Sequence, residues 1–168
     1  MRQMTVQTIR ELFAEGQIFK EYELLDTGVC HGSFKQWYEN GQISLQIRYK
    51  YGKENGEMLS WYRNGQLRSK VFYNNGTEQG ITKTWHENGK IHQQRPMQNG
   101  LLHGVVQTFD ANGKETREYF VNGKNRNFQR EEAGLMLDFL KFNSLHVTGD
   151  IAPSSIPDLL IALPYPSP

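Results

Sequence analysis

Residues 31–43 read HGSFKQWYENGQI, and this stretch decides the fold because it returns twice further along the chain. Residues 55–67 read NGEMLSWYRNGQL and residues 79–91 read QGITKTWHENGKI, so the copies are 24 residues apart. A fixed spacing of this length is typical of proteins that stack copies of one supersecondary unit. One structural unit of 24 residues is therefore expected to recur along the chain.

Glycines, asparagines and aromatic residues mark the same places in four successive units. The glycine series are Gly32, Gly56, Gly80 and Gly104; Gly41, Gly65, Gly89 and Gly113; and Gly28, Gly52, Gly76 and Gly100. The asparagines before the second glycine series are Asn40, Asn64, Asn88 and Asn112. The aromatic residues three positions before them are Trp37, Trp61, Trp85 and Phe109. A fainter copy without the asparagine covers residues 9–24, with Gly16 at the turn.

Each unit predicts a strand, a turn and a second strand. An Asn-Gly pair between two runs rich in aromatic and β-branched residues is the strongest short-range hairpin signal. In the first full unit the strands are expected at residues 33–38 and 42–49, joined by residues 39–41. The repeated Asn and Gly residues are expected to supply the left-handed backbone positions of these turns.

The alternation of side chains favours a turn of three residues over one of two. Positions equivalent to Ile43, Leu45, Ile47 and Tyr49 are mostly apolar. Positions equivalent to Gln42, Ser44, Gln46 and Arg48 are mostly polar, with Phe72 and Phe120 as exceptions. A three-residue turn closed by a left-handed glycine places Trp37 on the same face as the apolar positions, whereas a two-residue turn places it opposite. We therefore expect the apolar residues of both strands to share one face.

The fold class expected from these patterns is mainly β. It consists of an elongated single-layer antiparallel sheet of tandem 24-residue β-hairpins, followed by a small C-terminal helical cap. The array is expected over residues 1–124 and the extension over residues 125–168. The expected units lie near residues 8–25, 32–50, 56–74, 80–98 and 104–121.

Composition excludes several classes of function. Lys and Arg total 19 against 18 for Asp and Glu, so no excess of positive charge suits a nucleic-acid backbone. Cys30 is the only cysteine, which favours a reducing compartment. No apolar run reaches the roughly 20 residues of a membrane span, and no signal peptide is evident. A cytoplasmic protein is expected, with the interior of a virus particle as the alternative.

The repeated stretch quoted above resembles the MORN repeat, in the variant found in bacterial and viral proteins that include the YwqK-family antitoxins. The resemblance covers roughly residues 7–124. It implies a twisted antiparallel sheet of successive hairpins, with roles in protein scaffolding, in lipid contact for some members, and as antitoxins in bacteria. It implies no catalytic residues. Asp110 in the place of Tyr38 and Glu115 in the place of Ile43 depart from the pattern and suggest an end unit.

The repeat argues against an enzyme, because an active site needs unlike groups that converge on one point. Residues repeated every 24 positions lie in rows instead. The aromatic row of Trp37, Trp61, Trp85 and Phe109 is expected to form the core of the sheet, or else a groove for a ligand or peptide. The row of Tyr38, Tyr62 and His86 is expected to stiffen the sheet by cross-strand packing, or else to anchor a partner. No cofactor or metal site is expected, since His86 and His92 alone make a weak ligand set.

The C-terminal segment differs in kind from the repeats. Residues 127–142 carry an apolar stripe at helical spacing, formed by Leu135, Phe139 and Phe142. A short second helix is expected at residues 156–163, and the proline-rich end is expected to be extended. The segment is expected to cap the last repeats or to dock into another protein.

The leading functional hypothesis is a non-enzymatic module for protein interaction or scaffolding. A single-layer sheet cannot bury an apolar face by itself, and large exposed apolar patches usually mark interfaces. The partner could be a second copy, a toxin-like protein neutralised by this chain, or a component of a larger assembly. The alternative is a membrane-surface or phospholipid-binding module, for which Lys35, Arg48, Lys50 and Lys53 are the candidate residues.

Overall fold

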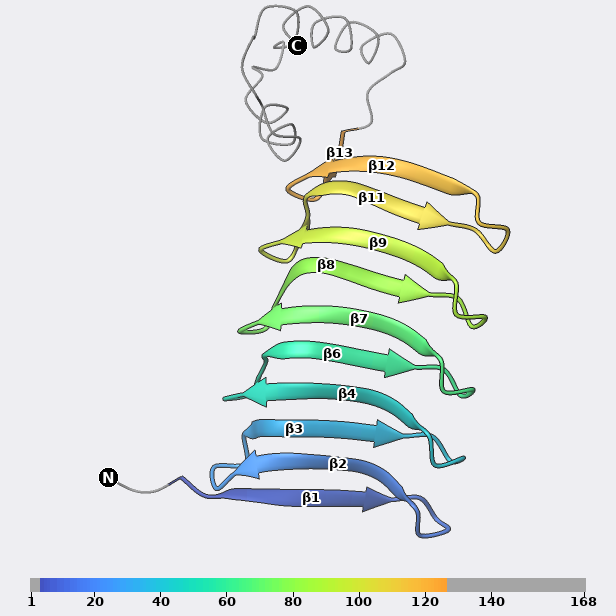
Figure 1. Ribbon diagram of the computed structural model, residues 1–168. Coiled ribbons are helices and arrows are strands. Elements are labelled where there is room, and N and C mark those ends of the chain that lie inside the picture. The colour runs from blue at the N-terminus through green and yellow to red at the C-terminus, as the bar shows by residue number, and fades with distance from the viewer. Residues whose placement is uncertain (1–3, 127–168) are drawn as a thin grey trace, which may run out of the picture. The chain divides into compact units, whose positions relative to one another are not determined.

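A computed structural model describes residues 4–126 of the chain, which form one open antiparallel sheet of 13 strands (Figure 1). The strands are β1 (Val6–Leu12), β2 (Ile18–Leu25), β3 (Cys30–Trp37), β4 (Ile43–Lys50), β5 (Lys53–Glu54), β6 (Gly56–Trp61), β7 (Leu67–Asn74), β8 (Thr77–Trp85), β9 (Ile91–Gln98), β10 (Leu101–Leu102), β11 (Gly104–Phe109), β12 (Glu115–Val121) and β13 (Lys124–Asn125). Each long strand pairs with the long strands before and after it in sequence, while β5 and β10 pair only with β4 and β9. The expected single-layer sheet of successive hairpins is confirmed for this part of the chain.

The chain divides into two units after Asn127, and only the first contains described residues. The helical cap expected in residues 125–168, with Leu135, Phe139 and Phe142, lies almost wholly outside the described residues. Within residues 4–126 no helix is present, and therefore none that is long and apolar enough to cross a membrane.

The Asn-Gly pairs form the expected three-residue turns. In the first full unit, the N–H of Gly41 donates to the carbonyl of Tyr38 at 2.9 Å, and the N–H of Tyr38 donates to the carbonyl of Gln42 at 2.8 Å. The φ angle of Gly41 is 80°, in the left-handed region that only glycine adopts without strain. The equivalent glycines have φ angles of 83°, 81° and 87° at Gly65, Gly89 and Gly113.

A second series of turns joins one unit to the next. Tyr51 and Gly52 have φ angles of 52° and 79°, and the flanking residues Lys50 and Lys53 pair with each other. Two consecutive positive φ angles define the two-residue turn whose twist matches that of the flanking strands. Equivalent turns occur at residues 75–76, 99–100 and 122–123. The third glycine series thus supplies hairpin turns as well, so every connection in the sheet is tight.

The expectation that Trp37 shares a face with Ile47 is wrong, because the second strand of the unit contains a β-bulge. Phe34 pairs with Ile47, yet Trp37 pairs with Ile43, and the register shift between them leaves Ser44 as an extra residue. Successive residues of a strand point to opposite faces, and Trp37 stands three positions after Phe34. Trp37 and Ile43 therefore lie on one face of the sheet, and Phe34 and Ile47 lie on the other.

The same register shift recurs in the next two units. We name the two faces after residues of the first full unit. The Phe34 face carries the cross-strand pairs Phe34–Ile47, Met58–Val71 and Thr82–Arg95. The Trp37 face carries Trp37, Trp61, Trp85 and Phe109.

The last unit is one residue shorter than the others and has no bulge. Its hairpin pairs in an unbroken register from Gly104 with Phe120 to Phe109 with Glu115. Phe120 therefore occupies the register position that Tyr49 holds opposite Gly32 in the first full unit. The apparent exception to the apolar pattern at Phe120 is thus the result of a missing residue, and Phe120 lies on the Phe34 face.

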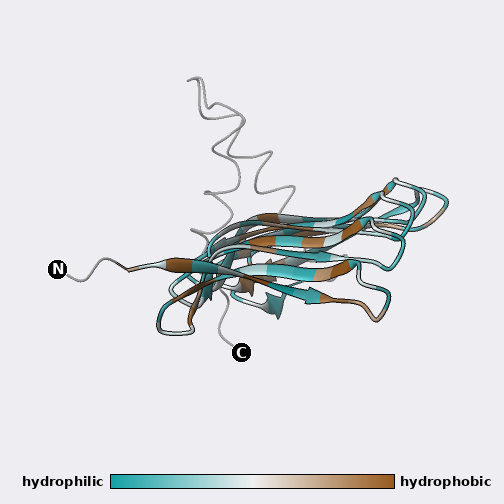
Figure 2. Cartoon of the chain, turned by 90° about the horizontal axis from the view of Figure 1, so that it is seen from below, coloured by the Kyte–Doolittle hydropathy of each residue, from teal (hydrophilic) through white to brown (hydrophobic). Residues whose placement is uncertain are grey.

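Few side chains are fully buried, as expected for a single layer of strands. The buried ones are Leu25, Ile47, Val71, Thr82 and Val106, and the last four lie on the Phe34 face. Figure 2 shows the sheet as one curved layer in which apolar and polar segments alternate along the strands. The Phe34 face therefore holds most of the small core.

Candidate functional site

The row of Tyr38, Tyr62 and His86 joins each repeat to the next one. The hydroxyl of Tyr38 donates to the carbonyl of Trp61 at 2.7 Å, and that of Tyr62 donates to the carbonyl of Trp85 at 2.8 Å. Nε2 of His86 lies 2.8 Å from the carbonyl of Phe109. These side chains are half-buried and engaged within the sheet, which favours their structural role over that of partner anchors.

The turn asparagines act in two directions. The side-chain oxygen of Asn40 accepts a hydrogen bond of 3.2 Å from the N–H of Gln42 in its own turn, and its Nδ2 donates to the carbonyl of Arg63 at 2.9 Å. Asn64 makes the same two contacts, to Gln66 and to the carbonyl of Glu87. Asn40 and Asn64 therefore close their own turns and also hold the turn of the next repeat. Within residues 4–126, Asn88 closes only its own turn, by accepting from the N–H of Lys90.

In the last unit, side-chain contacts within the hairpin replace these two kinds of contact between repeats. Oδ1 of Asp110, in the place of Tyr38, accepts hydrogen bonds of 2.9 Å from the N–H groups of Asn112 and Lys114. Glu115, in the place of Ile43, binds the guanidinium of Arg117 at 2.6 Å, and this hydrogen bond holds the pKa of Glu115 below its usual value. These contacts keep the side chains of Asp110 and Glu115 engaged within the final hairpin.

The aromatic row on the Trp37 face is only half-buried. Trp37, Trp61 and Trp85 each stand opposite an aliphatic residue across the hairpin, and Phe109 stands opposite Glu115. The aliphatic partners are Ile43, Leu67 and Ile91. On the same face Phe72, Ile81 and Val105 are 46%, 58% and 47% exposed. This face therefore presents aromatic and aliphatic side chains that the described residues leave partly open to solvent.

A row of polar side chains crosses the Phe34 face from β6 to β12. Its members pair directly across neighbouring strands. They are Ser60, Ser69, Thr84, Gln93, Thr108 and Thr116. The hydroxyls of Ser60 and Ser69 lie 2.6 Å apart, and the amide of Gln93 donates to the hydroxyl of Thr108 at 3.0 Å. We call this set the polar row.

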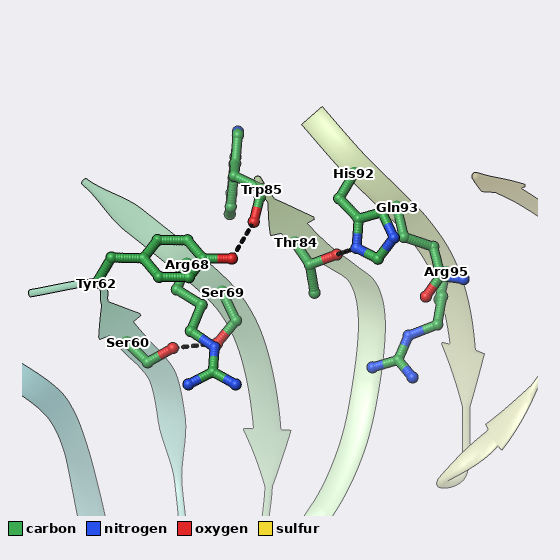
Figure 3. A pocket seen from close by; sticks show the side chains of 9 residues that line it. All are labelled: Ser60, Tyr62, Arg68, Ser69, Thr84, Trp85, His92, Gln93 and Arg95. Carbon is green, nitrogen blue, oxygen red and sulfur yellow. Dashed lines mark hydrogen bonds between the residues drawn. The ribbon is translucent and has the colours of Figure 1, made fainter. Parts of the chain in front are cut away.

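A groove of about 470 Å³ lies over the polar row, between the second and third full repeats (Figure 3). Its lining comprises Ser60, Tyr62, Arg68, Ser69, Thr84, Trp85, His92, Gln93 and Arg95. Arg68 comes from β7, Thr84 from β8, and His92 and Arg95 from β9. With Ser60 from β6, four strands therefore bring cationic, hydroxyl and amide groups to one depression in the sheet.

The groove contains positive charge that is only partly compensated. The guanidinium of Arg68 lies over the ring of Tyr62, 5.7 Å from its centroid. Arg95 approaches the carboxylate of Glu78 to 4.0 Å, while its Nε is buried without a hydrogen-bond partner. Nδ1 of His92 lies 3.3 Å from the hydroxyl of Thr84.

Reasoning from the sequence missed this groove, although the sequence contained a signal for it. The positions equivalent to Arg95 in the two preceding units hold Ile47 and Val71. These two apolar side chains are buried, with 3% and 6% of their surface exposed. An arginine at this position interrupts a buried apolar row. The interruption was visible in the sequence, but the bulge that brings Arg68 and His92 to the same face was not.

The histidines give no larger ligand set among residues 4–126. The rings of His86 and His92 approach to 4.5 Å between centroids, as their positions on one hairpin suggest. No group of three His, Cys, Asp or Glu side chains suited to a metal ion occurs in the described part of the chain.

Comparison with protein families identifies the repeat. The MORN repeat variant matches residues 31–51, 54–75 and 78–99. Each match ends at the first residue of a two-residue turn, namely Tyr51, Asn75 and Asn99. The first and last hairpins, which depart from the pattern, are not matched. No curated protein matches the chain in sequence. Such repeats are generally non-catalytic and associated with protein or membrane binding. Residues 31–99 of the chain therefore contain three tandem repeats that match the MORN repeat variant.

Proposed function

We propose that this chain is a non-enzymatic protein-binding module that contacts its partner through the Trp37 face. The observation that carries the proposal is the exposure of Phe72, Ile81 and Val105 beside a half-buried aromatic row on this face. Apolar side chains gathered on one face of a single layer usually mark an interface.

The aromatic row gives this surface the composition of a protein interface. Tryptophan side chains bring a large apolar area and one N–H donor, and such residues dominate the energetics of protein contacts. The equal spacing of Trp37, Trp61 and Trp85 along the array suits a partner that contacts several repeats at once. Neutralisation of a toxin-like partner and scaffolding of a larger assembly are both functions that such a surface supports.

The test compares proteins captured from the native source by the full chain and by two variants. The double variant Phe72→Ser/Ile81→Ser removes exposed apolar area from the Trp37 face. The control Tyr51→Ser removes a side chain that is 54% exposed and lies in the turn at residues 51–52, outside the paired strands. A partner of the Trp37 face is captured by the wild type and by the Tyr51 variant and is lost from the double variant.

Vesicle flotation with phosphatidylserine and phosphatidylcholine tests the membrane alternative on the same three proteins. If the wild type floats with the vesicles and the double variant does not, the Trp37 face binds a membrane surface and not a protein. Capture of the same proteins by all three chains would contradict the proposal, and so would failure of the wild type to retain any protein.

A further inference from the structure

The groove on the Phe34 face combines unlike groups, in contrast to the rows that the repeats otherwise form. Arg68, His92 and Arg95 occupy positions that hold Ser44 and Ile47 in the first full repeat. Because that repeat builds the same hairpin without these charges, the fold does not require them.

The side chain of Arg95 also lowers the stability of the sheet. Its Nε is a buried donor without a hydrogen-bond partner, so it has lost its bonds to water without replacing them. Glu78 is the only carboxylate paired with Arg95 among residues 4–126, and it also accepts a hydrogen bond from the hydroxyl of Thr82. Arg68 has no ion pair in the described part of the chain. An anionic ligand would satisfy both guanidinium groups.

The lining also indicates the kind of anion. Guanidinium groups match carboxylates through paired, parallel hydrogen bonds. The two guanidinium groups and the carboxylate of Glu78 together carry one net positive charge, which the single negative charge of a carboxylate neutralises. The polar row supplies hydroxyl and amide groups that both donate and accept, as the backbone of an extended peptide requires.

The dimensions of the polar row agree with a short peptide. From Ser60 on β6 to Thr108 on β11 the row crosses four strand spacings, or roughly 19 Å at about 4.8 Å each. An extended chain covers that length with about six residues, at roughly 3.3 Å per residue. The groove with the two arginines lies within this span.

We propose that the groove between the second and third full repeats binds an acidic side chain carried by an extended peptide segment of a partner protein. Arg68 and Arg95 bind the carboxylate, His92 and Thr84 line its surroundings, and the polar row contacts the peptide backbone. This site lies on the face opposite Trp37 and does not depend on the function proposed above.

Fluorescence polarisation with the full chain and a labelled peptide of about six alternating Glu and Ser residues tests the proposal. The variants Arg95→Val and Arg68→Ser each introduce the residue of a neighbouring repeat, so the hairpin keeps a sequence that already folds in this sheet. Arg48→Gln removes an equal charge from the Trp37 face and serves as the control. Circular dichroism confirms that each variant retains its sheet.

Loss of charge-assisted hydrogen bonds is expected to weaken binding by about tenfold or more in Arg95→Val and in Arg68→Ser. The Arg48 variant is expected to bind within about twofold of the wild type, since surface charges far from a site contribute little. A peptide with Gln in place of Glu is expected to bind far more weakly than the acidic peptide.

Three results would overturn the proposal. The first is no binding of the acidic peptide to the wild type, and the second is equal binding to the wild type and to Arg95→Val. The third is a phosphoserine peptide that binds through Arg95 more tightly than the glutamate peptide, which would assign the groove to a phosphate group instead. None of these results bears on the Trp37 face, so the two proposals fail separately.

Discussion

The hydroxyl of Tyr38 donates a 2.7 Å hydrogen bond to the backbone carbonyl of Trp61, 23 residues further along the chain. Tyr62 makes the same contact with the carbonyl of Trp85, so equivalent hydrogen bonds connect the first full repeat to the second and the second to the third. A hydrogen bond of this kind contributes about 0.5 to 1.5 kcal/mol to stability.

Removing the hydroxyl of either tyrosine is expected to weaken the contact between two neighbouring repeats. Tyr38→Phe and Tyr62→Phe should each lower the free energy of unfolding by about 1 kcal/mol, because the carbonyl beneath loses a half-buried donor. Urea titration followed by circular dichroism measures the change. Tyr51→Phe is the control, since Tyr51 is 54% exposed and its ring contacts His31 instead. An equal loss of unfolding free energy in all three variants would show that the contact between repeats does not depend on this hydrogen bond.

Asp110 is expected to stabilise the final turn through its side-chain oxygen. Asp110→Ala leaves the N–H groups of Asn112 and Lys114 without their acceptor and should cost about 1 kcal/mol. Asp110→Asn keeps an acceptor oxygen and should cost less. The amide exchange rates of residues 112 and 114 should rise in the alanine variant only. Unchanged exchange in that variant would argue against the role of the carboxylate.

Arg95→Val is expected to raise stability while it removes peptide binding. Valine stands at the equivalent position of the preceding repeat, where Val71 is 6% exposed, and it leaves no buried donor without a partner. The free energy of unfolding should increase by about 1 kcal/mol. Arg68→Ser, which changes an exposed side chain, should leave it within about 0.5 kcal/mol. A destabilised valine variant would mean that Arg95 supports the sheet through Glu78.

The sheet is expected to lose stability at alkaline pH through its half-buried tyrosines. Burial raises the pKa of Tyr73 above 10.0, and the carboxylates of Glu78 and Glu54 add to this effect. The folded state therefore holds its phenolic proton more tightly than the unfolded chain does. The resulting stabilisation is complete below pH 10.0 and is lost as the pH rises through the raised pKa.

Urea midpoints measured between about pH 9 and about pH 11 test this expectation. The wild type should lose stability over this range more steeply than Tyr73→Phe, which has no proton to lose at this position. Parallel curves for the wild type and Tyr73→Phe would place the alkaline transition elsewhere.

The turns could be predicted from the sequence because their left-handed backbone positions require glycine, and this glycine recurs every 24 residues. The faces could not, because an extra residue such as Ser44 moves the side chains before it to the other face. That bulge is defined by hydrogen-bond register, which composition does not record. The missing residue of the last unit was readable, since Gly123 follows Gly100 by 23 residues instead of 24.

The roles of Tyr38 and Asn40 needed the structure for a different reason. Both contact backbone carbonyl groups of the next repeat, and a carbonyl has the same chemistry at every residue. The sequence therefore contained the donors but no mark of their acceptors. The groove at Arg68 and Arg95 escaped prediction in the same way, because strand pairing and not sequence distance brings these side chains together.

The forward direction of the side-chain bonds has a consequence for synthesis on the ribosome. Tyr38, Asn40, Tyr62, Asn64 and His86 all reach acceptors that lie later in the chain. A hairpin that has just emerged therefore lacks the partners of its own tyrosine or histidine until the next 24 residues follow. At roughly 5 to 20 residues per second, the wait for each repeat is about 1 to 5 s. Each repeat of the nascent chain should thus form its side-chain hydrogen bonds only after the next repeat has been synthesised. The last hairpin is the exception, because Asp110 makes its hydrogen bonds within that hairpin.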